Sequence, residues 1–138
     1  MRLTRSGGQT AAGRQDWFTG TVHIDGIREP DDRSAVGSAH VRFAPGARTA
    51  WHSHPHGQTL YVTDGIGYVA TRGGEVHEIR PGDVVHIEPG EEHWHGATPT
   101  RFMAHIAIHE ADDQGQVATW LEHVLDSEYD QGADPRPS

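Results

Sequence analysis

Short segments that alternate hydrophobic and polar residues, separated by turns rich in glycine and proline, run through most of this chain. In one segment Ala39, Val41 and Phe43 alternate with polar residues, as in a strand with one buried face. Such segments lie at 17–24, 36–44, 49–54, 59–63, 67–71, 76–79, 84–87 and 101–109. Helices do not alternate with these strands, so the pattern predicts an all-β sandwich or barrel.

The pattern changes near the C-terminus, where hydrophobic residues recur at i, i+3, i+4 and i+7: Val117, Trp120, Leu121 and Val124. This spacing predicts one amphipathic C-terminal helix. Residues 1–15 and 129–138 lack such periodicity, so we expect a flexible N-terminal arm and a flexible C-terminal tail. Residues 16–128 then form one domain, as the length of 138 residues suggests.

Composition narrows the classes of function. The net charge of −9, with eleven arginines and no lysine, argues against nucleic-acid or anionic-membrane partners. The absence of cysteine excludes thiol nucleophiles, thiolate metal sites and disulfides. No hydrophobic run approaches the roughly 20 residues of a membrane span. We therefore expect a cytoplasmic protein whose partner is a small molecule.

Histidine is abundant, with twelve copies, and three of them fall close together in one stretch. His52 and His54 project from the same face of a strand, and a turn at 55–57 returns Gln58 beside them. His93, in a second cluster after another turn, is placed to join them. We predict that His52, His54, Gln58 and His93 hold one divalent metal ion. Such nitrogen and amide donors suit Mn, Fe, Ni, Co or Zn.

The spacing of these residues resembles the two motifs of the cupin superfamily. The first motif reads Gly46, five residues, His52-x-His54, three residues, Gln58, six residues and Gly65, with glutamine in place of the usual glutamate. The second motif retains Gly82, Gly90 and His93, but has Glu88 at the family's proline and Ala97 at its asparagine. The resemblance implies a single-domain jelly-roll barrel, a double-stranded β-helix, with the ion inside its mouth.

Three longer blocks are similar to small bacterial manganese cupins that act as hydroxynitrile lyases. They are PGARTAWHSHPHGQTLYVTDGIG, RPGDVVHIEPGEEHWHGATP and the ending MAHIAIHE followed by WLEHV. This likeness implies a lyase that cleaves cyanohydrins to an aldehyde and cyanide, and forms them in reverse. It also implies one metal ion per chain, with Mn²⁺ as first choice and Fe²⁺, Ni²⁺, Co²⁺ or Zn²⁺ as alternatives.

The reaction needs a base beside the metal. His105 lies on the strand face that we place inside the barrel, and it is our first choice for that base. His109 shares the same face and could receive cyanide or relay the proton, and His95 should also point inward. Ala39, Val41 and Phe43 are expected to line one wall of the substrate pocket.

Two other classes of function are open. A cupin dioxygenase, or another small-molecule enzyme, would use the same donors to hold a redox-active metal. A non-enzymatic cupin would bind a small ligand without any need for the metal. In each case we expect a homodimer or homotetramer, because small jelly rolls commonly cover exposed sheet edges by pairing.

Overall fold

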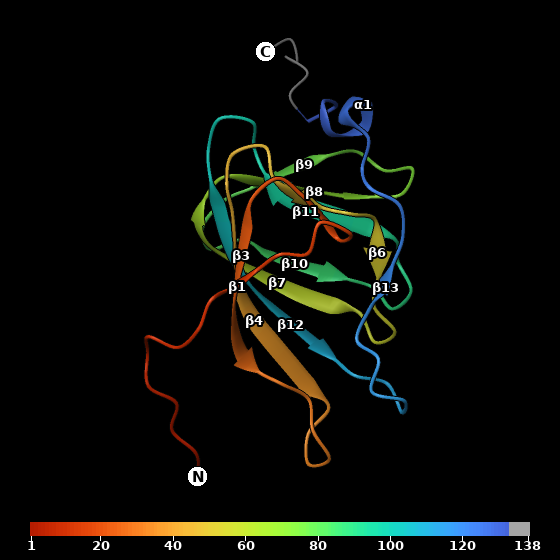
Figure 1. The fold of residues 1–138 in the computed structure, drawn as a ribbon. Coiled ribbons are helices and arrows are strands. Elements are labelled where there is room, and N and C mark those ends of the chain that lie inside the picture. The colour runs from red at the N-terminus through yellow and green to blue at the C-terminus, as the bar shows by residue number, and fades with distance from the viewer. Residues whose placement is uncertain (133–138) are drawn as a thin grey trace.

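The computed structural model describes residues 1–132 and is built almost entirely of antiparallel strands (Figure 1). The six-stranded sheet has the order β1 (Ala11–Ala12), β3 (Val22–Arg28), β4 (Val36–Phe43), β12 (Met103–Glu110), β7 (Gln58–Gly65) and β10 (Val84–Ile87). The second sheet has the order β13 (Thr119–Trp120), β6 (His52–Ser53), β11 (His93–Ala97), β5 (Arg48–Thr49) and β2 (Phe18–Thr19). In this sheet β8 (Gly67–Thr71) pairs with β11 and with β9 (His77–Ile79).

Hydrophobic side chains from both sheets meet in one core. Phe43, Val62 and Met103 come from the six-stranded sheet and are almost fully buried. They join Val69 and Ala97 of the second sheet in a single cluster. Alternating strands thus bury one face each, as their pattern predicts, and the all-β jelly-roll fold is confirmed.

The strand β11 is absent from the sequence-predicted elements, because all five of its residues are buried and no polar alternation marks it. It pairs with three other strands of its sheet. In this register His93 lies opposite His52 of β6. The register therefore brings the two histidine-rich segments together.

The predicted C-terminal helix is confirmed, but its predicted position over 117–124 is wrong. Thr119–Trp120 is instead the strand β13, which lies beside β6 with Trp120 opposite His52 (Figure 1). The pairing continues beyond the strand, since the amide of Leu121 donates to the carbonyl of Trp51 at 2.8 Å. Pairing with an open sheet edge satisfies the backbone here, so tertiary context overrides the helical spacing of the side chains.

One short helix, α1 (Asp126–Tyr129), does follow at the C-terminus. Buried Arg48 of β5 pairs with Asp126 at 2.7 Å and lies over the ring of Tyr129 at 4.4 Å. The hydroxyl of Tyr129 donates to the carbonyl of Ala97 at 2.6 Å. These contacts fix α1 against the second sheet.

The chain ends differ from one another. Ala11–Ala12, within the segment predicted as an arm, pairs with β3. Residues 133–138 of the predicted tail lie outside the described residues.

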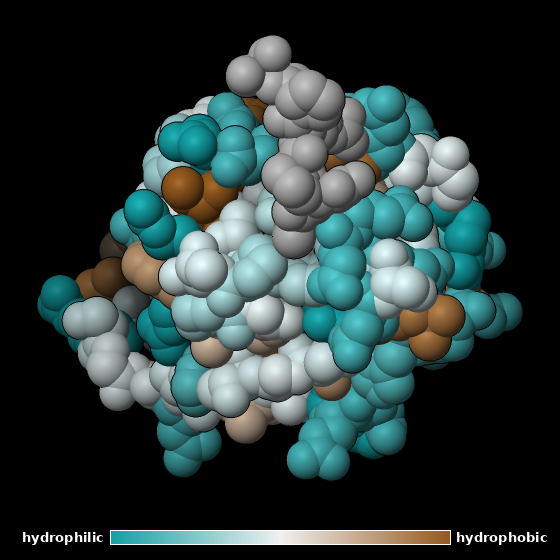
Figure 2. All heavy atoms as spheres, turned by 90° about the horizontal axis from the view of Figure 1, so that it is seen from above, coloured by the Kyte–Doolittle hydropathy of each residue, from teal (hydrophilic) through white to brown (hydrophobic). Residues whose placement is uncertain are grey.

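Seen from the α1 end, the surface is mostly hydrophilic and its hydrophobic groups are scattered (Figure 2). Among residues 1–132 no helix is long and apolar enough to cross a membrane.

The contacts of Tyr129 allow a test of how firmly α1 is attached. Tyr129→Phe should lower the free energy of unfolding by about 1 kcal/mol, since only the buried hydrogen bond is lost. Tyr129→Ala should cost about 3–5 kcal/mol, because the ring is removed as well. Urea unfolding followed by circular dichroism measures both. Leu125→Ala, at an exposed neighbour, is the control, and equal stability of all three variants would show that α1 is not docked.

Candidate metal centre and its cavity

The four residues predicted as metal ligands meet at one end of the barrel interior. His52 and His93 face each other across β6 and β11, with ring centroids 4.1 Å apart. His54, just after β6, lies 5.0 Å from His52 and 5.3 Å from His93 between ring centroids. The amide oxygen of Gln58, at the start of β7, lies 3.3 Å from Nε2 of His93. All four side chains are buried.

Backbone carbonyls fix the orientation of the three imidazoles. The carbonyl oxygens of Ala50, Val117 and Glu91 lie 2.9, 2.8 and 3.0 Å from Nδ1 of His52, His54 and His93, respectively. A carbonyl only accepts hydrogen bonds, so each Nδ1 carries the hydrogen. Each neutral ring therefore keeps a lone pair on Nε2, as in histidines that bind metals.

Burial keeps these imidazoles neutral. Desolvation lowers the pKa of His54 and of His93 to about 4, and holds the pKa of His52 well below its usual value. Nε2 of His54 is buried without a hydrogen-bond partner among the described residues. The contact between Nε2 of His93 and the oxygen of Gln58 joins two acceptors. A buried group of imidazole and amide acceptors fits a bound cation, so these residues suit a divalent metal ion.

His95 is a further candidate ligand. The metal-binding atoms of His52, His93 and His95 all lie within 4.8 Å of one another. However, Nδ1 of His95 lies 2.9 Å from Nε2 of His105, and not against a carbonyl. The two rings thus share one proton. Desolvation lowers the pKa of His105 to about 3 and that of His95 well below its usual value. The pair is neutral near pH 7 and is suited to proton transfer.

A cavity of about 410 Å³ is lined by three of the four predicted ligands, His52, His54 and Gln58. It is lined by all the residues predicted for catalysis and for the pocket wall, namely His95, His105, His109, Ala39, Val41 and Phe43. Phe43 packs against the rings of both His95 and His105. The remaining lining is mainly hydrophobic and includes Trp17 and Trp120.

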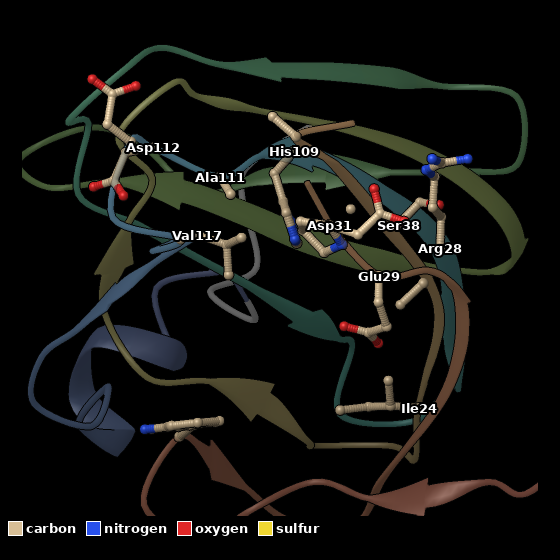
Figure 3. A pocket seen from close by; sticks show the side chains of 16 residues that line it. Ile24, Arg28, Glu29, Asp31, Ser38, His109, Ala111, Asp112 and Val117 are labelled. Atoms are coloured by element: carbon tan, nitrogen blue, oxygen red, sulfur yellow. The ribbon is translucent and has the colours of Figure 1, made fainter. Parts of the chain in front are cut away.

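An outer pocket of about 730 Å³ shares His109, Val117 and several other residues with this cavity. In Figure 3, His109 points into the space between Val117 on one side and Ser38 with Arg28 on the other. The ring of His109 stacks on that of His54, with centroids 5.5 Å apart. His109 therefore stands between the outer pocket and the metal centre.

Comparison with known proteins identifies the family. A model described as "Cupin domain" matches residues 39–108. The chain is 54% identical over 130 residues to a protein named (R)-mandelonitrile lyase from Granulicella tundricola, covering 94% of this chain and 98% of that protein. The chain belongs to the cupin family.

Solved structures agree with the cupin fold. A cupin-like protein from Thermotoga maritima MSB8 is 36% identical to this cupin, with a TM-score of 0.85 and coverage of 96% of this chain and 100% of the other. The polyketide cyclase RemF from Streptomyces resistomycificus has a TM-score of 0.71 at 16% identity, covering 98% and 94% of the two chains. The latter likeness is one of fold alone.

One feature of the centre escaped the sequence prediction, which placed Trp120 on a helix. Trp120 stacks on the ring of His52 with centroids 4.4 Å apart and an interplanar angle of 20°. Trp17 in turn stacks on Trp120, with ring centroids 5.0 Å apart. The cupin thus supports His52 from the side with two indoles. Only the pairing of β13 with β6, which has no clear signature in the sequence, creates this contact.

The two candidate ligand sets can be separated by substitution. His54→Ala should weaken Mn²⁺ binding by at least about 100-fold, because a direct ligand should matter more than an outer partner. His95→Ala should keep about one ion per chain, since His95 is committed to His105. Metal analysis after equilibrium dialysis measures both, with exposed His123→Ala as the control. Loss of metal in His95→Ala but not in His54→Ala would favour the set of His52, His93 and His95.

The lowered pKa values predict how the metal-free cupin responds to acid. Above pH 6.5 the histidines are neutral in both the folded and the unfolded chain. Between pH 6.5 and about 4 the unfolded chain takes up protons that buried His54 and His93 do not. Stability should therefore fall as the pH falls through this window, by about 1.4 kcal/mol per pH unit for each such proton.

Urea unfolding in the presence of a chelator at pH 7.5, 6.0 and 5.0 measures this dependence. His105→Asn removes one buried imidazole and should make the loss of stability shallower, whereas His123→Ala should leave the slope unchanged. An unfolding midpoint that is constant over this range would contradict neutral burial of these rings.

Proposed function

We propose that this cupin is a metal-dependent hydroxynitrile lyase, which cleaves cyanohydrins to an aldehyde and hydrogen cyanide and forms them in reverse. The relative named (R)-mandelonitrile lyase supports this reaction, because the identity of 54% extends over nearly the whole of both chains. The observation that carries the proposal is the buried group of neutral acceptors beside a hydrophobic cavity that also holds a histidine pair. One cavity thus offers a metal centre, a base and room for the substrate.

The ion would be held by His52, His54, Gln58 and His93, and we propose Mn²⁺ as that ion. Iron, nickel, cobalt and zinc are the alternatives, because imidazole and amide donors accept all of them. When bound, a divalent ion supplies Lewis acidity that lowers the pKa of a substrate hydroxyl. The four donors are all uncharged, so they would leave the ion its full positive charge.

The pair formed by His95 and His105 would accept the hydroxyl proton of the cyanohydrin. Nε2 of His95 has no hydrogen-bond partner among the described residues, and it is the open nitrogen of the pair. A proton that arrives there is stabilised because Nδ1 of His95 can donate to Nε2 of His105 at 2.9 Å. The geometry therefore supports a base made of both rings, with His95 in contact with substrate and His105 behind it.

Bond cleavage then follows from the loss of this proton. The electron pair of the O–H bond forms the carbonyl of the aldehyde, and the pair of the C–C bond leaves with cyanide. The proton held by the histidine pair passes to cyanide and gives hydrogen cyanide. His109, whose Nδ1 has no partner among the described residues, would donate a hydrogen bond to the leaving cyanide from the outer side of the cavity.

The shape of the cavity supports a hydrophobic substituent on the substrate. Its volume of about 410 Å³ is in the range of small-molecule sites. Ala39 and Val41 give it a small-residue wall on β4, and Phe43 closes the end near the histidine pair. An aromatic or branched aldehyde fits this lining.

The proposal predicts cleavage of mandelonitrile, followed by the absorbance of benzaldehyde. Chelation should abolish turnover and Mn²⁺ should restore it. His52→Ala and His93→Ala should be inactive because they lose a ligand. His105→Ala should keep its metal but lose up to about 10²–10⁴-fold in kcat, the usual contribution of a general base, because His95 loses the partner that stabilises its proton. Exposed His123→Ala serves as the matched control.

Other outcomes would assign the other classes of function. Oxygen uptake with a dione or flavonol, without cleavage of cyanohydrins by the metal-loaded protein, would indicate a dioxygenase. Ligand binding that survives chelation would indicate a non-enzymatic cupin. Full turnover in His105→Ala would remove His105 from the role of base.

A further inference from the structure

The segment 111–120, which we call the C-terminal strap, follows β12 and forms part of the cavity wall. It lies beyond residues 39–108, the part of the chain that matches the family model. The strap contributes five residues to the cavity lining, namely Gly115, Gln116, Val117, Ala118 and Trp120. At one end the amide of Ala111 donates to the carbonyl of Ala35 at 2.8 Å, and at the other end β13 pairs with β6. The strap is thus anchored at both ends.

Two of the four proposed metal ligands are held by this strap. The carbonyl of Val117 accepts the hydrogen bond from Nδ1 of His54 at 2.8 Å. Trp120 stacks on His52. By contrast, Nδ1 of His52 and Nδ1 of His93 are held by the carbonyls of Ala50 and Glu91, each two residues away in its own segment. The position of the strap therefore acts most directly on His54.

Asp112 organises the middle of the strap. Its Oδ1 accepts hydrogen bonds from the amides of Gln114 and Gln116, both at 2.9 Å. Its own amide donates to the carbonyl of Gln116 at 2.8 Å, and its carbonyl accepts from the amide of Gly115 at 3.0 Å. Four hydrogen bonds thus close a turn that ends at Gln116. Val117, whose carbonyl holds His54, is the next residue.

The conformation of this turn also depends on Gly115, which has a φ of +79°. In Figure 3, Asp112 lies at the edge of the outer pocket beside Ala111, with Val117 next along the wall. The neighbouring Asp113 lines the same pocket but makes no hydrogen bond through its side chain within residues 1–132. The two adjacent carboxylates therefore have the same charge but different structural roles.

We propose that Asp112 is a positioning residue for the metal centre. By closing the turn it sets the carbonyl of Val117, which in turn fixes the hydrogen on Nδ1 of His54 and aims Nε2 at the other donors. The inference rests on the metal site of the proposed function. Because coupling between two events is reciprocal, metal binding must also stabilise the closed strap. Groups that hydrogen-bond to ligating histidines and orient them commonly raise metal affinity by about 10–100-fold.

The test is the dissociation constant for Mn²⁺, measured by competition with a fluorescent chelator. Asp112→Ala should bind Mn²⁺ about tenfold more weakly than the wild type, the lower end of the range for direct partners, because Asp112 acts through the carbonyl of Val117. Asp112→Asn keeps the oxygen that accepts both amides, so it should stay within about threefold of the wild type. Asp113→Ala removes the same charge from the same pocket and should also bind normally. Equal affinities for Asp112→Ala and Asp113→Ala would overturn the proposal.

A second variant acts on the same turn without a change of charge. Gly115→Ala places a side chain at a positive φ, which should disfavour the closed turn and weaken Mn²⁺ binding by roughly fivefold. Hydrogen exchange at the amides of Gln114 and Gln116 should slow on addition of Mn²⁺ in the wild type and not in Asp112→Ala. Normal Mn²⁺ affinity in Gly115→Ala would contradict the role of the strap. So would amide hydrogen exchange at Gln114 and Gln116 that is the same with and without Mn²⁺ in the wild type.

These measurements separate this inference from the proposed function. A wild-type protein that binds no Mn²⁺ would overturn the metal site and the role of Asp112 together. A wild-type protein that binds Mn²⁺ without cleaving mandelonitrile would refute the lyase alone. In that case a weakened Asp112→Ala variant would still establish Asp112 as a positioning residue.

Discussion

The interaction on which the candidate site depends is the hydrogen bond from a histidine Nδ1 to a backbone carbonyl, made three times. Each bond fixes the tautomer of one buried ring and turns its lone pair toward the others. Nε2 of His54 has no hydrogen-bond partner among the described residues, and Nε2 of His93 meets the amide oxygen of Gln58, which is another acceptor. The centre is thus arranged around a positive charge, and its chemistry follows from that arrangement.

The pairing register of the strands places these histidines next to one another. The pairing of β6 with β11 sets His52 opposite His93, although the two residues belong to separate motifs. The histidine pair depends on a different contact, because His95 lies on β11 of one sheet and His105 on β12 of the other. The three proposed histidine ligands therefore come from the second sheet and its adjoining loop, whereas Gln58 comes from β7 of the six-stranded sheet. The proposed base is also made where the two sheets face each other. A single cavity lies between them.

The sequence predicted much of the fold and of the candidate site. Period-two patterns predicted the all-β fold, and the spacing of His52, His54 and Gln58 resembled a cupin motif that the comparisons confirm. The strand β11 was not predicted, because it is fully buried and its residues do not alternate between hydrophobic and polar. The hydrophobic spacing around Trp120 indicated a helix, but the chain pairs there as a strand. The bond between His95 and His105 depends on the distance between two sheets. Local pattern carries no information about that distance, so only the structure could place it.

Val117 supports His54 through its main chain, and every kind of amino acid has a carbonyl group. Evolution could therefore exchange the side chain at this position, and with it the outline of the entrance, while leaving the imidazole in place. The same holds for Ala50 and Glu91 behind the other two rings. In such a scaffold the side chains at the entrance can change while the backbone keeps the histidines in position. Related proteins could therefore diverge in the substrates they accept without a change in the metal centre.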